Sequence, residues 1–380
     1  MVATINSRSL LSMLKWPFLI ANLIFVLLLL LSYLAFYVRP ALVPALPFFG
    51  LAYPYILLVH LLFIAFWLIF RMKYAFISVV FIALGWNHVG RLVQLRIFDR
   101  SDTHSNGVIV MSYNVQNFIK TNTSTTKYIT DFQNKAEIIT FLKDSDPGIV
   151  CLQEFLYDRE DVKGFPGRFG LEIGCPYHYF ENYYEKSRNN IDAIATFSKY
   201  PVINHGVLMD AEKRYGIYTD LVIEKDTFRV YNLHLASIHF RQEDYQFFGD
   251  IANQPEQEKI RIGLMMIISK MKTAFIKRNH QVDQLREHFS LSPYPIIICA
   301  DLNDTPSSWA YNKVRHTRKD AFIVSGSGIG KTYAEDFFPA FRIDYIFHDP
   351  LLVSSRFKRH KIHLSDHYPV SCIISKEKSK

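Results

Sequence analysis

Two long runs without a charged residue, near the start of the chain, constrain its fold more than any other feature. Residues 16–38 and 51–70 contain no Asp, Glu, Lys or Arg and consist mainly of large apolar side chains. As a helix rising ~1.5 Å per residue, each run is long enough to cross the ~30 Å hydrocarbon core of a bilayer. The first run is too long for the apolar core of a cleaved signal peptide, and core helices of a soluble protein are a much weaker alternative.

A third uncharged run, residues 74–90, reaches only the lower length limit for a membrane-spanning helix. Asn87 and His88 weaken its end, whereas Trp86 fits an anchor at the membrane interface. We therefore predict that residues 1–100 form a membrane anchor with two or three transmembrane helices. The predicted spans are at about 16–38, 51–70 and 74–90.

Positive charge is concentrated in the first hundred residues, which contain eight Lys or Arg and one acidic residue. The whole chain has a net charge of +8, so residues 101–380 carry a net charge of only +1. A broad nucleic-acid-binding surface needs an excess of basic side chains. This balance therefore argues against a nucleic-acid footprint on the C-terminal part.

The charges that flank the apolar runs do not orient the anchor. With three spans and an inside N-terminus, four basic residues lie on each side of the membrane, so there is no positive-inside signal. The α-amino group and the short hairpin tip at Arg71 and Lys73 favour an inside N-terminus. We therefore predict a multi-pass membrane protein whose residues 101–380 lie on the non-cytoplasmic side.

Residues 101–380 are numerous enough for one large α/β domain with a substantial core. Short β-rich runs recur along them, and several are apolar throughout, as expected for strands buried on both faces. These runs are 108–113, 148–152, 193–197, 218–223, 228–233, 295–300, 342–347 and 369–374. Helical patterns lie between them at 131–143 and 256–289, which predicts two packed sheets with helices outside. The glycine-rich segment 155–190 predicts a long surface excursion.

Six polar clusters follow or end these apolar runs. They lie at residues 112–116, 152–154, 232–235, 300–304, 342–346 and 365–369. Their side chains include carboxylates, amides and imidazoles. Hard oxygen ligands and proton-transfer groups of this kind suit a divalent cation that binds a phosphate.

Glu154 and Asp366 are the candidate metal ligands. Glu154 follows a predicted buried strand, and magnesium takes few protein carboxylates while it keeps waters that a substrate displaces. Asp366 could complete the metal shell. Asn114 is too weak a ligand to anchor a cation, so we expect it to orient Glu154 or to contact the phosphate.

The candidate catalytic residues belong to the later clusters. Asp301 and Asn303 are two positions apart, so on an extended backbone they point the same way and could align a water and hold phosphoryl oxygens. Asp344 lies in an apolar run and needs a partner. His367 is the expected partner, because an aspartate fixes the tautomer of an imidazole and raises its basicity. His234 could protonate a leaving oxygen or neutralise phosphate charge.

Each cluster taken alone has a simpler explanation. Residues 301–306 favour a capping turn, His234 a structural histidine, and residues 365–367 a loop with a turn. The carboxylate of Asp344 is harder to explain in this way, because acidic residues inside such apolar runs are rare. In this order and together, the clusters favour one catalytic site.

Over residues 107–376 the chain resembles the endonuclease/exonuclease/phosphatase superfamily, which has a four-layered α/β/β/α sandwich like that of pancreatic deoxyribonuclease. The six clusters carry the resemblance, with support from residues 198–201 and from a helix that contains Arg278 and Gln281. The resemblance implies that Glu154 binds magnesium, with manganese as the alternative, and that Asp301 positions or deprotonates a water. It also implies phosphate-side roles for the side chains of Asn114, Asn303, His234 and the His367–Asp344 pair.

These observations predict a metal-dependent phosphoesterase that hydrolyses a phosphodiester or phosphomonoester by in-line attack of an activated water. A membrane tether and a nearly neutral domain favour a lipid headgroup or a small phosphoester at the bilayer surface. A membrane-tethered endonuclease or exonuclease stays open as an alternative, because a small basic stripe could contact nucleic acid. Its candidate residues are Arg159, Lys163, Lys186 and Arg188. A catalytically silent binding module and a transporter are less favoured, and no obligate protein partner is evident.

The predicted topology can be tested with reporters fused after Lys380. Three spans with an inside N-terminus export the C-terminal end, so an alkaline phosphatase fusion should be active, because that reporter folds only after export. An inactive fusion, together with a fluorescent cytoplasmic reporter at the same position, would instead indicate two spans and a cytoplasmic catalytic domain.

Overall fold

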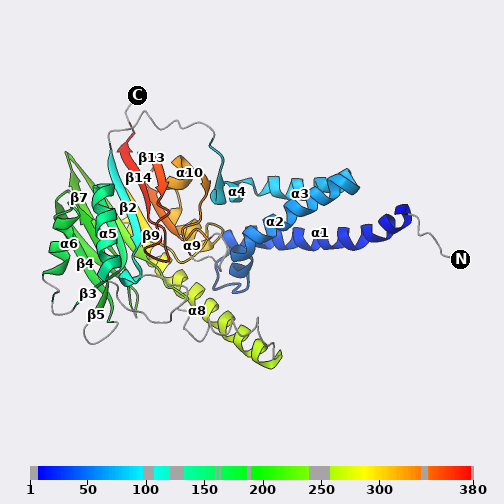
Figure 1. Ribbon diagram of the computed structural model, residues 1–380, viewed down its shortest axis with the longest axis horizontal. Helices are drawn as coiled ribbons and strands as arrows, with labels where there is room; N and C mark the ends of the chain where they lie inside the picture. Colours follow the sequence, from blue (N-terminus) through cyan, green and yellow to red (C-terminus); the bar gives the residue numbers. More distant parts are fainter. Residues whose placement is uncertain are drawn as a thin grey trace.

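A computed structural model describes residues 7–96, 107–119, 132–158, 161, 164–185, 190–211, 213–238, 257–334 and 341–377. The N-terminal helices project together from one side of a body that contains two β-sheets (Figure 1). The chain thus has an elongated apolar part and a compact mixed α/β part. The order of these two parts along the chain follows the charge and hydropathy pattern of the sequence.

The first two apolar runs form long helices, α1 (Ser7–Tyr37) and α2 (Leu46–Phe70). Within them, Lys15–Tyr37 and Leu46–Phe70 are long and apolar enough to cross a membrane. Many of their large apolar side chains are exposed, and such a surface is stable in lipid rather than in water. The prediction of two helices of membrane-spanning length is confirmed.

The third apolar run is broken. It forms α3 (Met72–Leu84) and α4 (Trp86–Leu92), which are bent by 72° at Gly85. A Cβ atom at Gly85 would lie 2.0 Å from Cζ of Tyr33, so only glycine allows this close approach. The run 74–90 is therefore not one straight helix. With 13 residues, α3 alone is about 20 Å long, and a third crossing stays a prediction.

A buried polar cluster joins the three apolar helices. His60 Nδ1 of α2 lies 3.0 Å from Ser78 Oγ of α3, which donates to Asn22 Oδ1 of α1 at 3.0 Å. All three side chains are fully buried among apolar neighbours. Interhelical hydrogen bonds in such surroundings contribute about 0.6–2 kcal/mol each to helix association. The cluster therefore holds α3 in one bundle with α1 and α2.

The body contains two six-stranded sheets. The first has the order β10 (Lys319–Asp320), β12 (Asp344–His348), β9 (Ile296–Asp301), β8 (Asp226–His234), β7 (Arg214–Ile223) and β6 (Val202–Met209). The second has the order β13 (Leu352–Arg359), β14 (Val370–Lys376), β2 (Val108–Asn114), β3 (Ile149–Asp158), β5 (Asn190–Ser198) and β4 (Tyr177–Glu185). A further pair, β1 (Val93–Gln94) and β11 (Gly328–Ile329), lies outside both sheets.

Each six-stranded sheet contains one parallel pair, β2–β3 in the second sheet and β8–β9 in the first. Parallel neighbours need a long crossover connection, usually through a helix. Here α5 (Phe132–Ser145) connects β2 to β3, and α8 (Gln257–Ser290) connects β8 to β9. The helical patterns at 131–143 and 256–289 correspond to these two crossovers.

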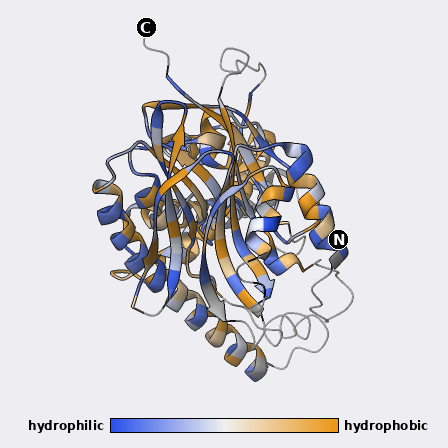
Figure 2. Cartoon of the chain, turned by 90° about the vertical axis from the view of Figure 1, so that its left-hand side faces the viewer, coloured by the Kyte–Doolittle hydropathy of each residue, from blue (hydrophilic) through white to orange (hydrophobic). Residues whose placement is uncertain are grey.

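Three apolar cores separate four layers. Val110, Cys151, Val230 and Cys299 belong to the core between the sheets. A second core lies between the second sheet and the helices α5 and α6 (Phe165–Glu172), and a third lies between the first sheet and the helices α8 and α9 (Trp309–Arg315). Hydrophobic residues therefore run along the central strands of both sheets (Figure 2). The predicted four-layered α/β/β/α sandwich is confirmed.

The predicted surface excursion over 155–190 is wrong in its described part. Residues 155–158 extend β3, and α6 and β4 follow. Pro166 lies in the first turn of α6, where proline is tolerated, while Phe165 and Phe169 pack against Phe155 of β3. Burial of these rings outweighs the glycine and proline signals. The strands β6 and β13 were not predicted, because their side chains are partly exposed and form no continuous apolar run.

The anchor and the body share a core. Phe36, near the end of α1, is buried in the core that contains α8 and α9, and its carbonyl oxygen accepts from Asn312 Nδ2 at 2.9 Å. Arg342 of the body donates to the Arg91 carbonyl oxygen at 3.1 Å, and the Arg91 guanidinium lies 3.8 Å from the centre of the Phe36 ring. Because the anchor fills part of the body's core, the two parts have one fixed relative orientation.

Substitution of Phe36 tests this shared core. Phe36→Ala should lower the free energy of unfolding of the full chain in detergent by about 3 kcal/mol, because it leaves a cavity under α9. Leu34→Ala is the matched control, since Leu34 is 45% exposed on the same helix and its loss leaves no cavity in the body. Chemical denaturation measures both values. Equal effects of the two substitutions would show that Phe36 does not support the body.

Candidate active site

Four predicted site residues meet at one edge of the two sheets. Asn114 ends β2, His234 ends β8, Asp301 ends β9, and Asp344 begins β12. On the first sheet, Asp301 pairs in register with both His234 and Asp344 on the neighbouring strands. The carboxyl ends of parallel strands lie at the same sheet edge, and the start of an antiparallel neighbour joins them there. The topology itself therefore brings these side chains together.

Glu154 reaches this edge through a β-bulge. The register of β3 shifts between Leu152 and Phe155, and Glu154 has φ +52°, a left-handed conformation that non-glycine residues seldom adopt. A bulge re-aims a side chain relative to the regular pleat. Asn114 Nδ2 donates to Glu154 Oε1 at 3.1 Å, and Asn117 Nδ2 donates to Oε2 at 3.2 Å. The carboxylate is thus fixed by two amides, while 25% of the side chain stays exposed.

Asp301 is the most buried carboxylate of the site. Its Oδ2 accepts from Asn114 Nδ2 at 3.0 Å, and its Oδ1 accepts from the backbone N–H of Asn303 at 2.9 Å. The Nε2 atoms of His234 and His367 lie 3.7 and 3.8 Å from Oδ2. Asp301 therefore lies between two imidazoles, with one amide fixing its orientation.

Asn303 turns back toward the same edge. It has φ +50°, which asparagine tolerates better than most residues, and its Nδ2 donates to the Leu235 carbonyl oxygen at 3.1 Å. This contact ties the loop after β9 to the loop after β8. It also occupies one amide N–H of the predicted phosphate ligand, which leaves the other N–H and the amide oxygen for a substrate.

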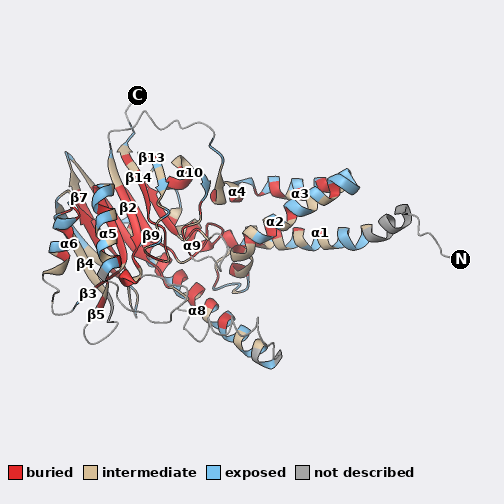
Figure 3. Ribbon diagram, viewed as in Figure 1, coloured by how far each residue is buried: buried red, intermediate tan, exposed pale blue. Residues whose placement is uncertain are grey.

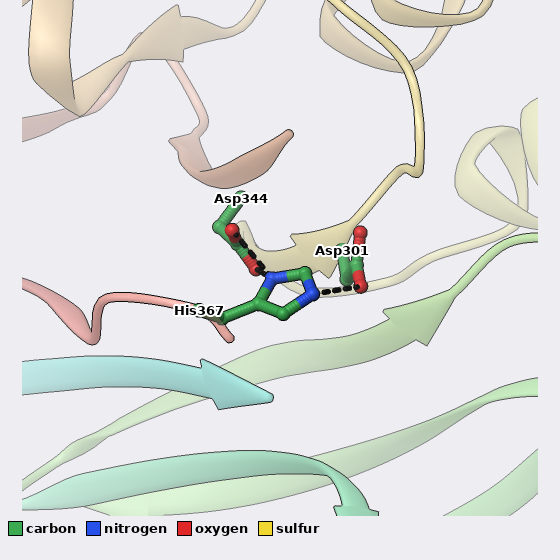
Figure 4. Close-up of side chains that lie close together, drawn as sticks. All are labelled: Asp301, Asp344 and His367. Atoms are coloured by element: carbon green, nitrogen blue, oxygen red, sulfur yellow. Dashed lines mark hydrogen bonds and ion pairs between the residues drawn. The ribbon is translucent and has the colours of Figure 1, made fainter. Parts of the chain in front are cut away.

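Asp344 and His367 form the predicted pair. His367 Nδ1 lies 3.0 and 3.1 Å from the two Asp344 oxygens, and both side chains are buried (Figure 4). Burial alone lowers the pKa of His367, but the carboxylates of Asp344, Asp301 and Asp366 outweigh burial and raise that pKa well above its ordinary value. The imidazole is therefore the group of the pair that holds the proton. Its Nε2 faces Asp301.

The donor set suits a divalent cation. Among the residues that the structure describes, no Lys or Arg forms an ion pair with Glu154, Asp301 or Asp344. Three carboxylates beside two histidines leave negative charge uncompensated, and a metal ion would supply the missing positive charge. Glu154 offers hard oxygens at the exposed side of the cluster, as a magnesium site requires.

A second group of possible ligands is buried deeper. Asp301, Asp344 and His367 each offer an atom within 4.8 Å of the others. However, His367 Nδ1 is held by Asp344, and the neighbouring carboxylates raise the pKa of the ring. Because a histidine binds a metal only in its neutral form, this arrangement favours a proton on His367 over a metal ion. The role of Glu154 as the metal ligand stays a prediction.

Asp366 lies on the rim of the site. Its Oδ1 is 3.9 Å from His367 Nε2, and its backbone N–H donates to Gln116 Oε1 at 3.2 Å. Ser365 Oγ donates to the Asn114 carbonyl oxygen at 2.8 Å, so this loop is fixed against β2. The structure thus places Asp366 beside His367, and its role as a metal ligand stays a prediction.

Several supporting residues were missed in the sequence. Asn117 holds Glu154, and Thr332 Oγ1 accepts from the backbone N–H of Asp344 at 3.1 Å. Tyr333 lies edge-on to the His367 ring, with the ring centres 5.5 Å apart. Asn117 was detectable as a second amide just after the first polar cluster. Thr332 and Tyr333 carry no signal in the sequence, because long-range contacts, such as the pairing of Tyr333 with His367, bring their segment to the site.

The family model described as the Endonuclease/Exonuclease/phosphatase family matches residues 111–367. The chain belongs to this family. Its members hydrolyse phosphoester bonds and generally depend on a divalent metal ion. A second model, described as a domain of unknown function, matches residues 15–92, and no curated protein matches the sequence.

Solved structures of similar fold share little sequence with this chain. An endonuclease/exonuclease/phosphatase from Beutenbergia cavernae is 14% identical, with a TM-score of 0.49 and 71% of each chain covered. The human Nocturnin catalytic domain with bound sulfate is 16% identical, with a TM-score of 0.48 and coverage of 71% of this chain and 95% of that one. The Neisseria 3′ phosphatase NExo, bound to a product DNA hairpin, is 15% identical, with a TM-score of 0.47 and coverage of 70% and 99%.

Double substitution tests whether Asp344 and His367 act as a unit. Asp344→Asn and His367→Ala should each lower kcat/KM for bis-p-nitrophenyl phosphate by ~10²-fold or more. The double variant should be little worse than either single variant, because residues that act together are not additive. His205→Ala, an exposed histidine of β6, is the control. Fully multiplicative losses would mean that the two side chains act independently.

Proposed function

We propose that the chain is a membrane-anchored, magnesium-dependent phosphoesterase that hydrolyses a phosphodiester or phosphomonoester by in-line attack of water. One observation carries the proposal. A buried Asp301 lies within 3.8 Å of two imidazoles, and it shares the amide of Asn114 with an exposed Glu154. A buried carboxylate, two imidazoles and a hard carboxylate ligand thus surround one point at the sheet edge.

Magnesium, with manganese as the alternative, would be held by Glu154 and Asp366 and would neutralise charge on the phosphoryl oxygens. Asp301 is placed to orient the attacking water and to accept its proton. Asn303 can offer its second amide N–H to the phosphate, because only one N–H is used by the Leu235 carbonyl oxygen. Asn114 donates both of its amide N–H groups to Glu154 and Asp301, so it would contact the phosphate only by exchanging one of these bonds, and its main role is to orient the two carboxylates.

The two histidines have different proposed roles. His367, kept protonated by Asp344, donates from Nε2 toward the phosphoryl oxygens and stabilises their charge. His234 Nε2 lies 3.6 Å from Glu154 Oε1, on the other side of Asp301, where it can protonate a leaving oxygen. With the bond to the leaving group broken, the proton lost by the water remains on Asp301 until it is released to solvent.

The anchor supports a substrate at the bilayer surface. The shared core at Phe36 and the contact between Arg342 and Arg91 hold the body close to the apolar helices. Tethering keeps the catalytic body at a high effective concentration of lipid headgroups. The body therefore needs no basic groove to attract such a substrate. We therefore propose a lipid headgroup or a small phosphoester as substrate, on the non-cytoplasmic side. The basic stripe of the nuclease alternative cannot be placed, because Arg159, Lys163, Lys186 and Arg188 lie outside the described residues.

A substrate panel tests this proposal. The purified full chain in detergent is assayed with magnesium against sphingomyelin, phosphatidylinositol phosphates, plasmid DNA and bis-p-nitrophenyl phosphate. Release of a phosphorylated headgroup or of phosphate from a lipid is the expected result. Cleavage of plasmid DNA alone would favour the nuclease, and no turnover of any substrate would contradict the assignment as a phosphoesterase.

Glu154→Gln tests the metal ligand. The substitution keeps the shape of the side chain but removes the charge that a hard cation requires, so kcat should fall by ~10²-fold or more at saturating magnesium. Glu172→Gln, an exposed residue of α6, is the matched control and should be fully active. The assay on the best substrate of the panel measures both. Normal turnover of the Glu154→Gln variant, with EDTA present, would contradict a metal-dependent mechanism.

A further inference from the structure

The first half of α8 is apolar and exposed. Residues 260–268 consist of apolar side chains except for Arg261 and Gly263, and they point in all directions around the helix. The exposed members of this group are Ile262, Leu264, Met265, Met266 and Ile268. Met265 and Met266 are 56% and 52% exposed. A helix segment that is apolar all round is normally surrounded by apolar material, but within the described part of the chain Ile267 is the one side chain of this segment that is buried.

The second half of α8 is an ordinary amphipathic helix. From Met271 onward, buried side chains recur every three or four positions, and Val282, Leu285 and Phe289 pack against the first sheet. In Figure 3 the helix is accordingly buried where it crosses the body and exposed toward its N-terminal end. The second half of α8 buries its apolar side chains and the first half does not. The exposed apolar surface is therefore specific to the first half.

The exposed half of α8 lies beside the membrane anchor. Ile267, Met271 and Phe275 pack against Phe48 and Leu51, which belong to the first turns of α2. The ring centres of Phe48 and Phe275 are 5.5 Å apart. Because Leu46–Phe70 is a candidate membrane span, this contact lies where the chain enters the bilayer. From there the exposed end of α8 extends away from the body, toward the side from which α1, α2 and α3 project (Figure 1).

We infer that residues 260–269 of α8 lie in the interface of the bilayer that holds the anchor, with their apolar side chains among the acyl chains. The segment is about 15 Å long, too short to cross a membrane but long enough to lie within its headgroup region. Lys270 and Lys272 follow the apolar stretch, whereas Arg261 lies within it and pairs with Glu258 at 2.7 Å. Basic residues at these positions suit anionic headgroups, as in other interfacial helices.

The same helix contacts the catalytic edge. Arg278 Nη1 donates to the Ala236 carbonyl oxygen at 2.8 Å, and its Nε lies 3.3 Å from Asp304 Oδ2. Ala236 follows His234 by two residues, and Asp304 follows Asn303 directly. One helix thus connects the bilayer to the two loops that carry His234 and Asn303. This second attachment, beside the anchor, fixes how the catalytic edge is presented to the membrane.

Fluorophore labelling of single cysteines tests the inference without any assay of activity. The four native cysteines are buried, so a cysteine added at the surface is labelled selectively. Met265→Cys probes the segment, and Leu171→Cys, 68% exposed on α6, is the control at the opposite end of the body. The full chain is reconstituted in phosphatidylcholine vesicles with phosphatidylserine. Because both sites belong to one body, they lie on the same side of each membrane.

The label at position 265 should be quenched by doxyl groups carried on the lipid chains and should be several-fold less sensitive to aqueous iodide than the label at 171. Equal sensitivity to iodide would place the segment in water and overturn the inference. Protection from both quenchers would indicate a protein contact, such as a second copy of the chain, and would also overturn it. Met266→Cys provides an independent second site if the first variant does not fold.

Discussion

The rest of the site depends on how the buried carboxylate of Asp301 is compensated. A carboxylate without solvent is costly unless hydrogen bonds and positive charge compensate it. Asn114 and the backbone of Asn303 supply the hydrogen bonds, and His367, whose pKa is raised by the surrounding carboxylates, supplies the nearest positive charge. These partners come from strands of both sheets. Compensation of Asp301 is therefore possible only after the two sheets have packed face to face.

The sequence predicted those features that depend on local pattern. Uninterrupted apolar runs predicted the central strands, and the helical patterns predicted the two crossovers. Polar residues at the ends of apolar runs favoured one site, and in the structure Asn114, His234, Asp301 and Asp344 lie at one sheet edge. The pairing of Asp344 with His367 was predictable for a simple reason, because a carboxylate in an apolar run needs a partner.

Features that depend on long-range contact were not predictable. The bulge at Glu154 changes the direction of a side chain within a strand, and nothing in residues 149–158 signals it. The helix α6 and the strand β4 are stabilised by aromatic packing that outweighs glycine and proline. The burial of Phe36 in the body was also not predictable, because Phe36 belongs to an apolar run that was predicted to lie in lipid. Such a residue has two compatible environments, and only the assembled structure decides between them.

The contacts of Arg342 have a consequence for the order in which this chain folds during synthesis. Its guanidinium joins Asp320 to the carbonyl oxygen of Arg91, a residue 251 positions earlier. The last strand, β14, also inserts between β13 and β2. The apolar helices can assemble around their polar cluster early, but the second sheet stays open until the C-terminal residues have left the ribosome. The body is therefore completed last, against an anchor that is already in the membrane.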